Sequence, residues 1–142
     1  MAPLKKADSK QANQACAVPY RRRKGKLELC LITSSAKRWS FPKGNIDPGD
    51  TPADAAIKEA LEEAGLRGHL VGEPLGLCEL EKSGQTQTVV VWLMEVEQCD
   101  AQWEEKDIRQ RRWVSPKEAR RLFCRDAFRR CLDAAVTRLK AA

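Results

Sequence analysis

With 142 residues, of which 42% are hydrophobic and 32% charged, the chain has the size and composition of one soluble globular domain. No apolar run approaches the roughly 20 residues that would span a bilayer, and the first residues lack the apolar core of a secretory signal, so we expect a cytoplasmic protein with no membrane partner. The formal net charge is +6, and it is unevenly spread: residues 1–43 hold eleven Lys or Arg against two acids, a pattern that attracts polyanions.

The N-terminal third of the chain predicts a tail followed by a β-hairpin. Residues 1–14 carry no hydrophobic pattern and are expected to form a flexible tail, which leaves residues 15–142 as a single domain. The apolar stretches 15–20 and 26–33 flank a basic turn that contains a glycine, which favours a hairpin. A loop rich in Gly, Asn, Asp and Pro follows from Gly44 to Asp50.

The next segment predicts a helix with clear ends. Thr51 is a suitable N-cap, Pro52 suits the first helical position, and Gly65 can adopt the left-handed conformation that ends helices. At 100° per residue, the apolar side chains gather on one face. The opposite face carries three carboxylates, those of Glu59, Glu62 and Glu63.

The second half of the chain predicts more strands and two closing helices. Strands are expected over 71–81, 86–97 and 110–115, and the second of these is apolar enough to be central and buried on both faces. Helices are expected over 116–123 and 126–140. This order of elements predicts an α/β (α+β) sandwich with a mixed sheet. Six scattered cysteines predict reduced thiols, because they form no close pair and no dense framework.

The carboxylates of the central helix raise a question of charge. Glu59 and Glu63 lie one turn apart, which destabilises an isolated helix, and Glu59 has no basic neighbour one turn away. An acidic face in contact with solvent is one interpretation. The other is a divalent cation, since glutamates about 6 Å apart along a helix can converge on a hard ion such as Mg²⁺. A metal beside basic side chains suits the hydrolysis of a phosphoanhydride, with a free glutamate as proton acceptor.

The segment Gly44–Leu66 resembles the Nudix box, G-x5-E-x7-R-E-U-x-E-E-x-G-U, where U is apolar. Gly44, Glu59, Ala60, Glu62, Glu63, Gly65 and Leu66 match at the required spacings. Asp50 stands where the family usually has Glu, and Lys58 where it has Arg. The resemblance implies a Nudix α/β/α sandwich and a Mg²⁺ site, with Mn²⁺ as the alternative ion. It also assigns roles to individual residues: metal ligands at Glu59, Glu63 and the Gly44 carbonyl, a proton acceptor at Glu62, and structural support from Asp50, Lys58 and Gly65.

The flanking segments resemble diphosphoinositol polyphosphate and diadenosine polyphosphate hydrolases. This resemblance implies a pyrophosphohydrolase acting on a highly phosphorylated small molecule. We expect the phosphates to be bound by basic side chains around the mouth of the site: Arg21, Arg22, Arg23, Arg38, Lys43 and Arg112. Alternatives are an RNA 5′-pyrophosphohydrolase or nucleoside triphosphate pyrophosphatase, and a non-catalytic module that binds nucleotide or nucleic acid.

The tryptophans and two further acids complete the candidate residues. Trp92 and Trp113 lie in predicted strands and are expected in the core, whereas Trp103 lies in a polar loop and is expected to stack on substrate or to act as a lid. For Glu104 and Glu105, the favoured interpretation is that they are loop acids in contact with solvent. The alternative is that one of them is a distal metal ligand or a catalytic acid. The sequence leaves the oligomeric state open.

Overall fold

The strands of the chain form one mixed, seven-stranded sheet. The structure, a computed structural model, describes residues 3–141. Its strand order is β3-β2-β1-β6-β5, with β4 paired to β1 and β7 paired to β2. β1 and β6 run parallel, and the other pairs are antiparallel, as the sequence predicts for a mixed sheet. The strands are β1 (Gln14–Arg23), β2 (Lys26–Thr33), β3 (Trp39–Ser40), β4 (Lys43–Asn45), β5 (Leu66–Lys82), β6 (Gln85–Cys99) and β7 (Arg111–Val114).

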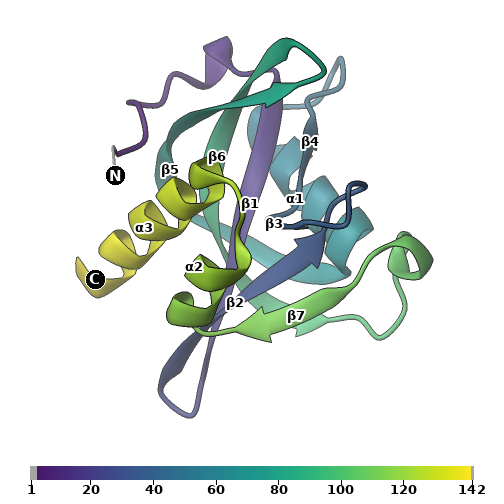
Figure 1. Cartoon of the computed structure of the whole chain (residues 1–142), viewed down its shortest axis with the longest axis vertical. Coiled ribbons are helices and arrows are strands. Elements are labelled where there is room, and N and C mark those ends of the chain that lie inside the picture. Colours follow the sequence, from purple (N-terminus) through teal and green to yellow (C-terminus); the bar gives the residue numbers. More distant parts are fainter. Residues whose placement is uncertain (1–2, 142) are drawn as a thin grey trace.

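Helices cover both faces of this sheet and make a three-layer α/β/α sandwich (Figure 1). The α-helices are α1 (Pro52–Ala64), α2 (Pro116–Leu122) and α3 (Asp126–Ala141), and two short 3₁₀ turns are η1 (Ser9–Gln11) and η2 (Lys106–Ile108). Along β6, Val89, Val91 and Leu93 pack on the side of α2 and α3, while Val90, Trp92 and Met94 pack on the side of α1. The central strand is therefore buried on both faces, which confirms the prediction from its continuous apolar run.

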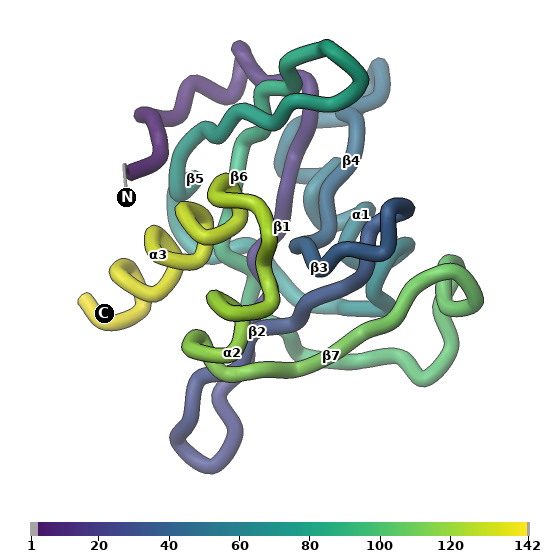
Figure 2. The backbone as a smooth tube through the Cα atoms, in the orientation of Figure 1, coloured from purple at the N-terminus to yellow at the C-terminus, as the bar shows by residue number. Residues whose placement is uncertain are grey.

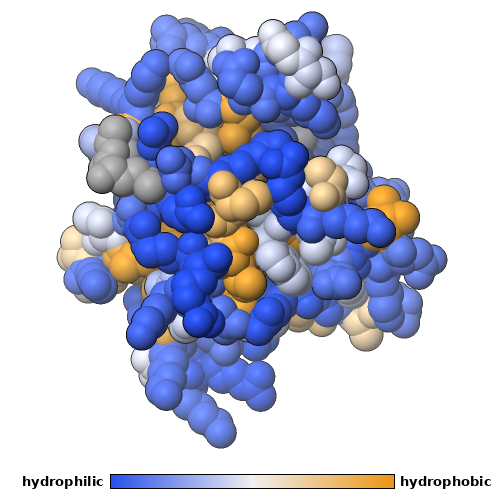
Figure 3. Space-filling model, viewed as in Figure 1, coloured by the Kyte–Doolittle hydropathy of each residue, from blue (hydrophilic) through white to orange (hydrophobic). Residues whose placement is uncertain are grey.

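The two faces of the sheet are packed with different side chains. Three aromatic rings, those of Phe41, Phe123 and Phe128, contact one another under α2 and α3. The α1 face is built largely from alanines, both on the helix and on β1. Such small side chains bring the helix close to the sheet, and this closeness positions the carboxylates described below. On the side that carries α2 and α3, the outer surface is mostly hydrophilic, with small separate apolar areas (Figure 3).

Local signals set the ends of the main elements as predicted. Thr51 Oγ1 accepts a hydrogen bond from the Asp54 amide at 3.1 Å, and Gly65 ends α1 with φ of 65°. The β1–β2 turn places Lys24 and Gly25 at positive φ, which suits the twist of a two-residue hairpin. All six cysteines are free thiols, and four of them are buried, in agreement with the prediction.

The segment predicted to be a flexible tail, residues 1–14, contacts the sheet near both its ends: Asn13 exchanges hydrogen bonds with Thr88 of β6, and Gln14 already belongs to β1. Lys5 and Leu77 exchange two backbone hydrogen bonds, of 3.1 and 2.9 Å, and Leu4 packs against the core on the α3 side. Figure 2 shows this segment running beside β5. A Cβ on Gly76 would lie 2.6 Å from the Lys5 carbonyl oxygen, so glycine makes room for the contact. The flexibility of the tail and the domain boundary stay predictions. Among residues 3–141, no helix combines the length and the apolar character needed to cross a membrane.

Candidate active site

Helix α1 presents its three glutamates at one end of the sandwich. Its alanine face is fully buried against the sheet, which turns the opposite face toward β4 and the loop after β6. Glu59 and Glu62 are partly buried, and Glu63 is only 7% exposed. A carboxylate buried this far needs a proton, a cation or strong hydrogen bonds, because burial alone disfavours its charge.

The Glu59 carboxylate lies directly against the backbone of β4. A Cβ added to Gly44 would come under 3.0 Å from the carboxylate carbon and both oxygens of Glu59, and 2.7 Å from Oε2. Only a residue without a side chain leaves this space free. The structure thus places Glu59 next to Gly44, as expected of two groups that bind the same metal ion.

Glu63 is held by donors on one side and meets Glu59 on the other. Its Oε1 accepts a hydrogen bond from the Lys43 amide at 3.1 Å, and Arg109 Nη2 lies 3.5 Å from its Oε2. The pKa of Glu63 is raised from 4.5 to about 8, mainly by burial and also by the neighbouring Glu59 carboxylate, while Arg109 acts to lower it. Two carboxylates packed together under a strand favour a shared proton or a shared divalent cation. The donor set of carboxylate oxygens and an adjacent backbone carbonyl therefore fits a hard ion of the Mg²⁺ class.

Glu62 belongs to a second acidic group. One carboxylate oxygen from each of Glu62, Glu104 and Glu105 lies within 4.8 Å of the others. Burial raises the pKa of Glu62, and the Glu59 and Glu104 carboxylates raise it further. The structure thus brings both loop acids next to Glu62; Glu104 is exposed, as the favoured solvated position predicts, and Glu105 is partly buried. This acidic cluster is a second place at which a cation could be held.

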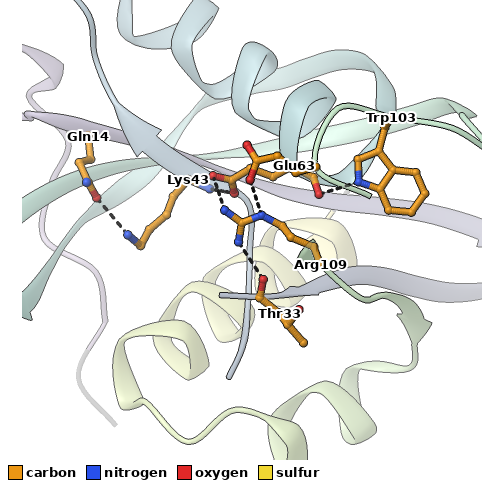
Figure 4. A network of polar contacts seen from close by, with 7 residues as sticks. Gln14, Thr33, Lys43, Glu63, Trp103 and Arg109 are labelled. Atoms are coloured by element: carbon orange, nitrogen blue, oxygen red, sulfur yellow. Dashed lines mark hydrogen bonds and ion pairs between the residues drawn. The ribbon is translucent and has the colours of Figure 1, made fainter. Parts of the chain in front are cut away.

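Arg109 is a site residue that sequence reasoning missed. Its Nε donates to Glu105 Oε1 at 2.7 Å and its Nη1 donates to the Thr33 carbonyl at 2.8 Å. Figure 4 shows the guanidinium between Thr33 and Glu63, with Lys43 directed toward Gln14 beside them. Arg109 follows a single 3₁₀ turn, so no helix or strand periodicity marked it out in the sequence.

For the hydrolase activity that the sequence resemblance implies, Arg109→Lys should lower kcat/KM about tenfold and Arg109→Met should lower it further, because lysine keeps the charge but loses the planar fork. In Arg109→Met the positive charge is also lost, so the pKa of Glu63 rises and the acid limb of the pH profile of kcat/KM moves to higher pH, whereas Arg109→Lys should shift it little. The measurement is that profile for both variants. Arg112→Met is the control, since Arg112 is exposed and pairs with Glu118. An unshifted profile with normal kcat/KM would contradict the role given to Arg109.

A cavity of about 520 Å³ opens beside Gly44 and Glu63. Of the cations predicted to bind phosphate, Arg38 and Lys43 line it. Burial lowers the pKa of Lys43, and its Nζ donates to Gln14 Oε1 at 3.2 Å. Three further cations that the sequence did not single out also line the cavity: Lys82, Arg109 and Arg125. The cavity therefore has the charge of a phosphate-binding site.

The prediction that Arg21, Arg22 and Arg23 surround the mouth is corrected by their place on β1. Gln14, at the start of the strand, lines the cavity, and Arg21 lies seven residues further on, which is about 23 Å of extended chain. Arg21 Nε instead pairs with Glu28 Oε1 at 2.8 Å, and its guanidinium stacks on Trp113. The hairpin tip projects from the opposite end of the sheet from β4 (Figure 1). Arg112, paired with Glu118, does not line the cavity either.

The prediction that Trp103 is a lid or stacking residue is also corrected. Its ring is partly buried against Gly65, and its Nε1 donates to the Glu63 carbonyl at 3.0 Å. The tryptophan that lines the cavity is Trp39. Trp92 is buried and Trp113 is partly buried against the same hydrophobic cluster, which agrees with the expected core positions.

The two departures from the family pattern contact each other. Lys58 Nζ lies 2.8 Å from Asp47 Oδ2 and 3.5 Å from Asp50 Oδ2, so the lysine ties the loop before α1 to the helix. A shorter acid and an unbranched cation thus still meet at this position. These pairs are substantially exposed and are expected to stabilise the fold only weakly.

Comparison with known proteins agrees with this geometry. A family profile described as the NUDIX domain matches residues 10–134. Nudix hydrolase 13, mitochondrial, of Arabidopsis thaliana is 35% identical over 111 residues, covering 70% of this chain and 54% of that protein. Human diphosphoinositol polyphosphate phosphohydrolase 3-alpha is 33% identical over 96 residues, covering 65% of this chain and 57% of that protein. The chain thus spans little more than half the length of these curated relatives.

Solved structures share the whole fold. The crystal structure of a Caenorhabditis elegans Ap4A hydrolase superposes with a TM-score of 0.76 at 25% identity, over 89% of this chain and 96% of that one. The profile match covers most of the chain, including all three glutamates of α1, the adjoining strand β4 and the cations of the cavity. The chain therefore belongs to the Nudix domain family.

Proposed function

We propose that the protein is a Mg²⁺-dependent pyrophosphohydrolase, with Mn²⁺ as the alternative ion, that cleaves a phosphoanhydride in a highly phosphorylated small molecule. The observation that carries the proposal is that a group of carboxylates lies next to a group of positively charged side chains. The carboxylates of Glu59 and Glu63 meet at Gly44, and a cavity with five cations opens beside them. Metal-bound phosphate and free phosphate oxygens are the ligands that such an arrangement accommodates.

Each residue of the site has a proposed task. The carboxylates of Glu59 and Glu63 and the carbonyl of Gly44 would hold the ion, which when bound supplies Lewis acidity toward phosphate and water. Glu62 accepts the proton of the attacking water at its carboxylate, and its raised pKa makes it a stronger base than an ordinary glutamate. Arg109 keeps Glu63 oriented through its link to Glu105. Arg38, Lys43, Lys82 and Arg125 bind the phosphates that are not cleaved.

The substrate class follows from the cavity and from the names of the relatives. The matched proteins include diphosphoinositol polyphosphate phosphohydrolases and Ap4A hydrolases by name. A compact substrate with several phosphates suits the positive cavity, and Trp39 at its wall offers an aromatic surface to an adenine ring. We therefore propose diphosphoinositol polyphosphates or diadenosine polyphosphates. The predicted cytoplasmic location stays a prediction, since relatives named as mitochondrial and chloroplastic are among those matched.

A phosphate-release panel tests the proposal. Wild-type protein and Glu62→Gln are assayed with Mg²⁺ or Mn²⁺ on inositol pyrophosphates, diadenosine polyphosphates, nucleoside triphosphates and triphosphorylated RNA. Release from the first two classes, lost at least about 100-fold in Glu62→Gln, is expected. Release from RNA alone or from nucleoside triphosphates alone would support those alternatives instead. Tight binding with no release from any substrate would identify a non-catalytic module.

We expect Arg125→Gln to raise KM for the preferred substrate about tenfold or more, because a charge-assisted hydrogen bond contributes about 1.5 to 3 kcal/mol. Its effect on kcat is expected to be small, since Arg125 directly precedes α3, which packs on the opposite face of the sheet from the α1 glutamates. The matched control is Arg22→Gln, an exposed arginine at the far end of β1 that should leave KM unchanged. Steady-state kinetics at fixed ionic strength measures both. If Arg22→Gln raised KM more than Arg125→Gln, the β1–β2 hairpin would have to be part of the substrate-binding site.

A further inference from the structure

The last turn of α1 is held by a segment from elsewhere in the chain. A helix normally leaves its final carbonyls without partners inside the helix, and they are satisfied by water, glycine-type caps or side chains. In this protein, residues 100–111, which comprise the loop between β6 and β7 and the first residue of β7, supply a donor to each of four consecutive carbonyls. The pairs are Glu105 N to Glu62 O at 3.1 Å, Trp103 Nε1 to Glu63 O at 3.0 Å, Arg111 Nη1 to Ala64 O at 2.8 Å and Asp100 N to Gly65 O at 2.8 Å.

The ring of Trp103 is fixed between two neighbours in this arrangement. A Cβ on Gly65 would lie 2.8 Å from Trp103 Cβ, so the ring packs tightly on the helix end. On the other side, the Arg111 guanidinium lies 4.0 Å from the ring centroid, within cation–π range. The indole is thereby prevented from turning away, and its N–H stays directed at the Glu63 carbonyl.

Hydrogen bonds consequently hold Glu63 at both its backbone carbonyl and its side-chain carboxylate. Its backbone carbonyl accepts from Trp103, and its carboxylate accepts from the Lys43 amide (Figure 4). The same loop also places Glu105 against Arg109, which contacts the Glu63 carboxylate. One short segment therefore sets both the position of the helix end and the surroundings of its buried carboxylate.

We propose that Trp103 is a positioning residue for Glu63, acting through the hydrogen bond from its indole to the Glu63 carbonyl. The inference rests on the proposed function in one respect, namely that Glu63 is a metal ligand. A group that orients a metal ligand from behind commonly affects metal affinity or activity by about 10- to 100-fold. Trp103 itself lines no part of the cavity, so its loss should affect the metal and the turnover number while leaving substrate affinity intact.

The test compares two tryptophan-to-phenylalanine changes that remove the same N–H group. In Trp103→Phe the donor to Glu63 is lost, and the ring remains. In Trp113→Phe the removed donor is buried and has no hydrogen-bond partner among the described residues. We expect Trp103→Phe to weaken Mn²⁺ binding, measured directly by electron paramagnetic resonance, about tenfold and to lower kcat by a similar factor with KM nearly unchanged. Trp113→Phe should match wild type in all three.

A measurement on the wild-type protein covers the case in which Trp103→Phe does not fold. Indole ¹⁵N–¹H spectra during a Mg²⁺ titration should show the Trp103 signal shifting with saturation, because coupling between the ion and the Glu63 backbone is reciprocal. The Trp113 signal should stay in place. A stationary Trp103 signal, or equal Mn²⁺ affinity and kcat in the two variants, would overturn the inference while leaving the proposed function standing. Wild-type protein that neither binds Mn²⁺ nor releases phosphate would overturn both.

Discussion

Replacing Glu63 with glutamine is expected to lower phosphate release at least about 100-fold. At pH values above 7, and without added divalent cation, the same substitution is expected to raise the temperature at which half of the protein is unfolded. The first effect follows from the proposed role of Glu63 as a metal ligand, because the substitution removes the charge of that ligand. The second follows from burial, since Glu63 is 7% exposed and carries the cost of placing a carboxylate there. Glutamine has nearly the same shape and no charge to bury.

The pH dependence of this second effect has a definite sign. The pKa of Glu63 is raised, by burial first and by Glu59 in addition, from 4.5 to about 8 in the folded protein. Between these two values the folded protein binds a proton that the unfolded chain releases, so the free energy of unfolding falls as pH rises through the window. The wild type and Glu63→Gln should therefore differ least near pH 4 and most at pH 8 and above.

Thermal unfolding across this pH range, with and without Mg²⁺, separates the two roles. Added Mg²⁺ at pH 8 should raise the thermal midpoint of the wild type, because the proposed ion binds the folded state, and should raise that of Glu63→Gln by a smaller amount. Glu79→Gln is the control, an exposed acid of β5 that pairs with Lys5 on the surface. Equal phosphate release by Glu63→Gln and Glu79→Gln would remove Glu63 from the site.

The second large effect is expected from Gly44→Ala, which adds a single methyl group. That methyl would lie under 3.0 Å from the Glu59 carboxylate carbon and both its oxygens, so either β4 or the side chain must move. Overpacking of this kind costs about 1 to 3 kcal/mol of stability. Displacing a reacting or ligating group by about 1 Å can lower activity about 100-fold, and we expect a loss of that size.

A double-mutant cycle with Glu59→Ala distinguishes this collision from a general disturbance of β4. If the methyl acts through Glu59, the stability cost of Gly44→Ala should largely disappear in the Glu59→Ala background, giving a coupling energy well above experimental error. Chemical denaturation measures stability in all four proteins, and phosphate release is followed in the two that keep Glu59. An additive cycle with full activity in Gly44→Ala would mean that Glu59 does not lie where the structure places it.

Local signals were sufficient to predict the helix and its glutamates. Thr51, Pro52 and Gly65 mark the ends of α1 by backbone chemistry that depends only on neighbouring residues. The apolar stretches likewise predicted the central strand, because burial on both faces leaves a continuous apolar run. The mixed sheet and its two helical layers follow from the order of these elements.

Residues positioned by tertiary contacts could not be predicted in this way. Lys82, Arg109 and Arg125 reach the cavity from a hairpin, a loop and a helix start, and none of these positions has a periodic pattern. The density of basic residues in the sequence pointed instead to the β1–β2 hairpin. Charge density does not indicate which end of a strand lies at the site, so this prediction was wrong. Trp103 was expected to be a lid because its loop is polar, whereas its partner is a backbone carbonyl some forty residues away.

The alanine seam under α1 sets the dimensions of the site without taking part in its chemistry. Ala56, Ala60 and Ala64 are fully buried against the sheet, together with Ala15 and Ala17 of β1. Because alanine has only a methyl side chain, these residues allow the helix to pack close to the strand. The distance between helix and strand in turn sets how far the carboxylates of α1 lie from the backbone of the sheet. A larger side chain anywhere in this seam would lift the helix and widen the gap between Glu59 and Gly44. If the proposed metal site is correct, its selectivity for small, hard ions depends partly on these unreactive alanines.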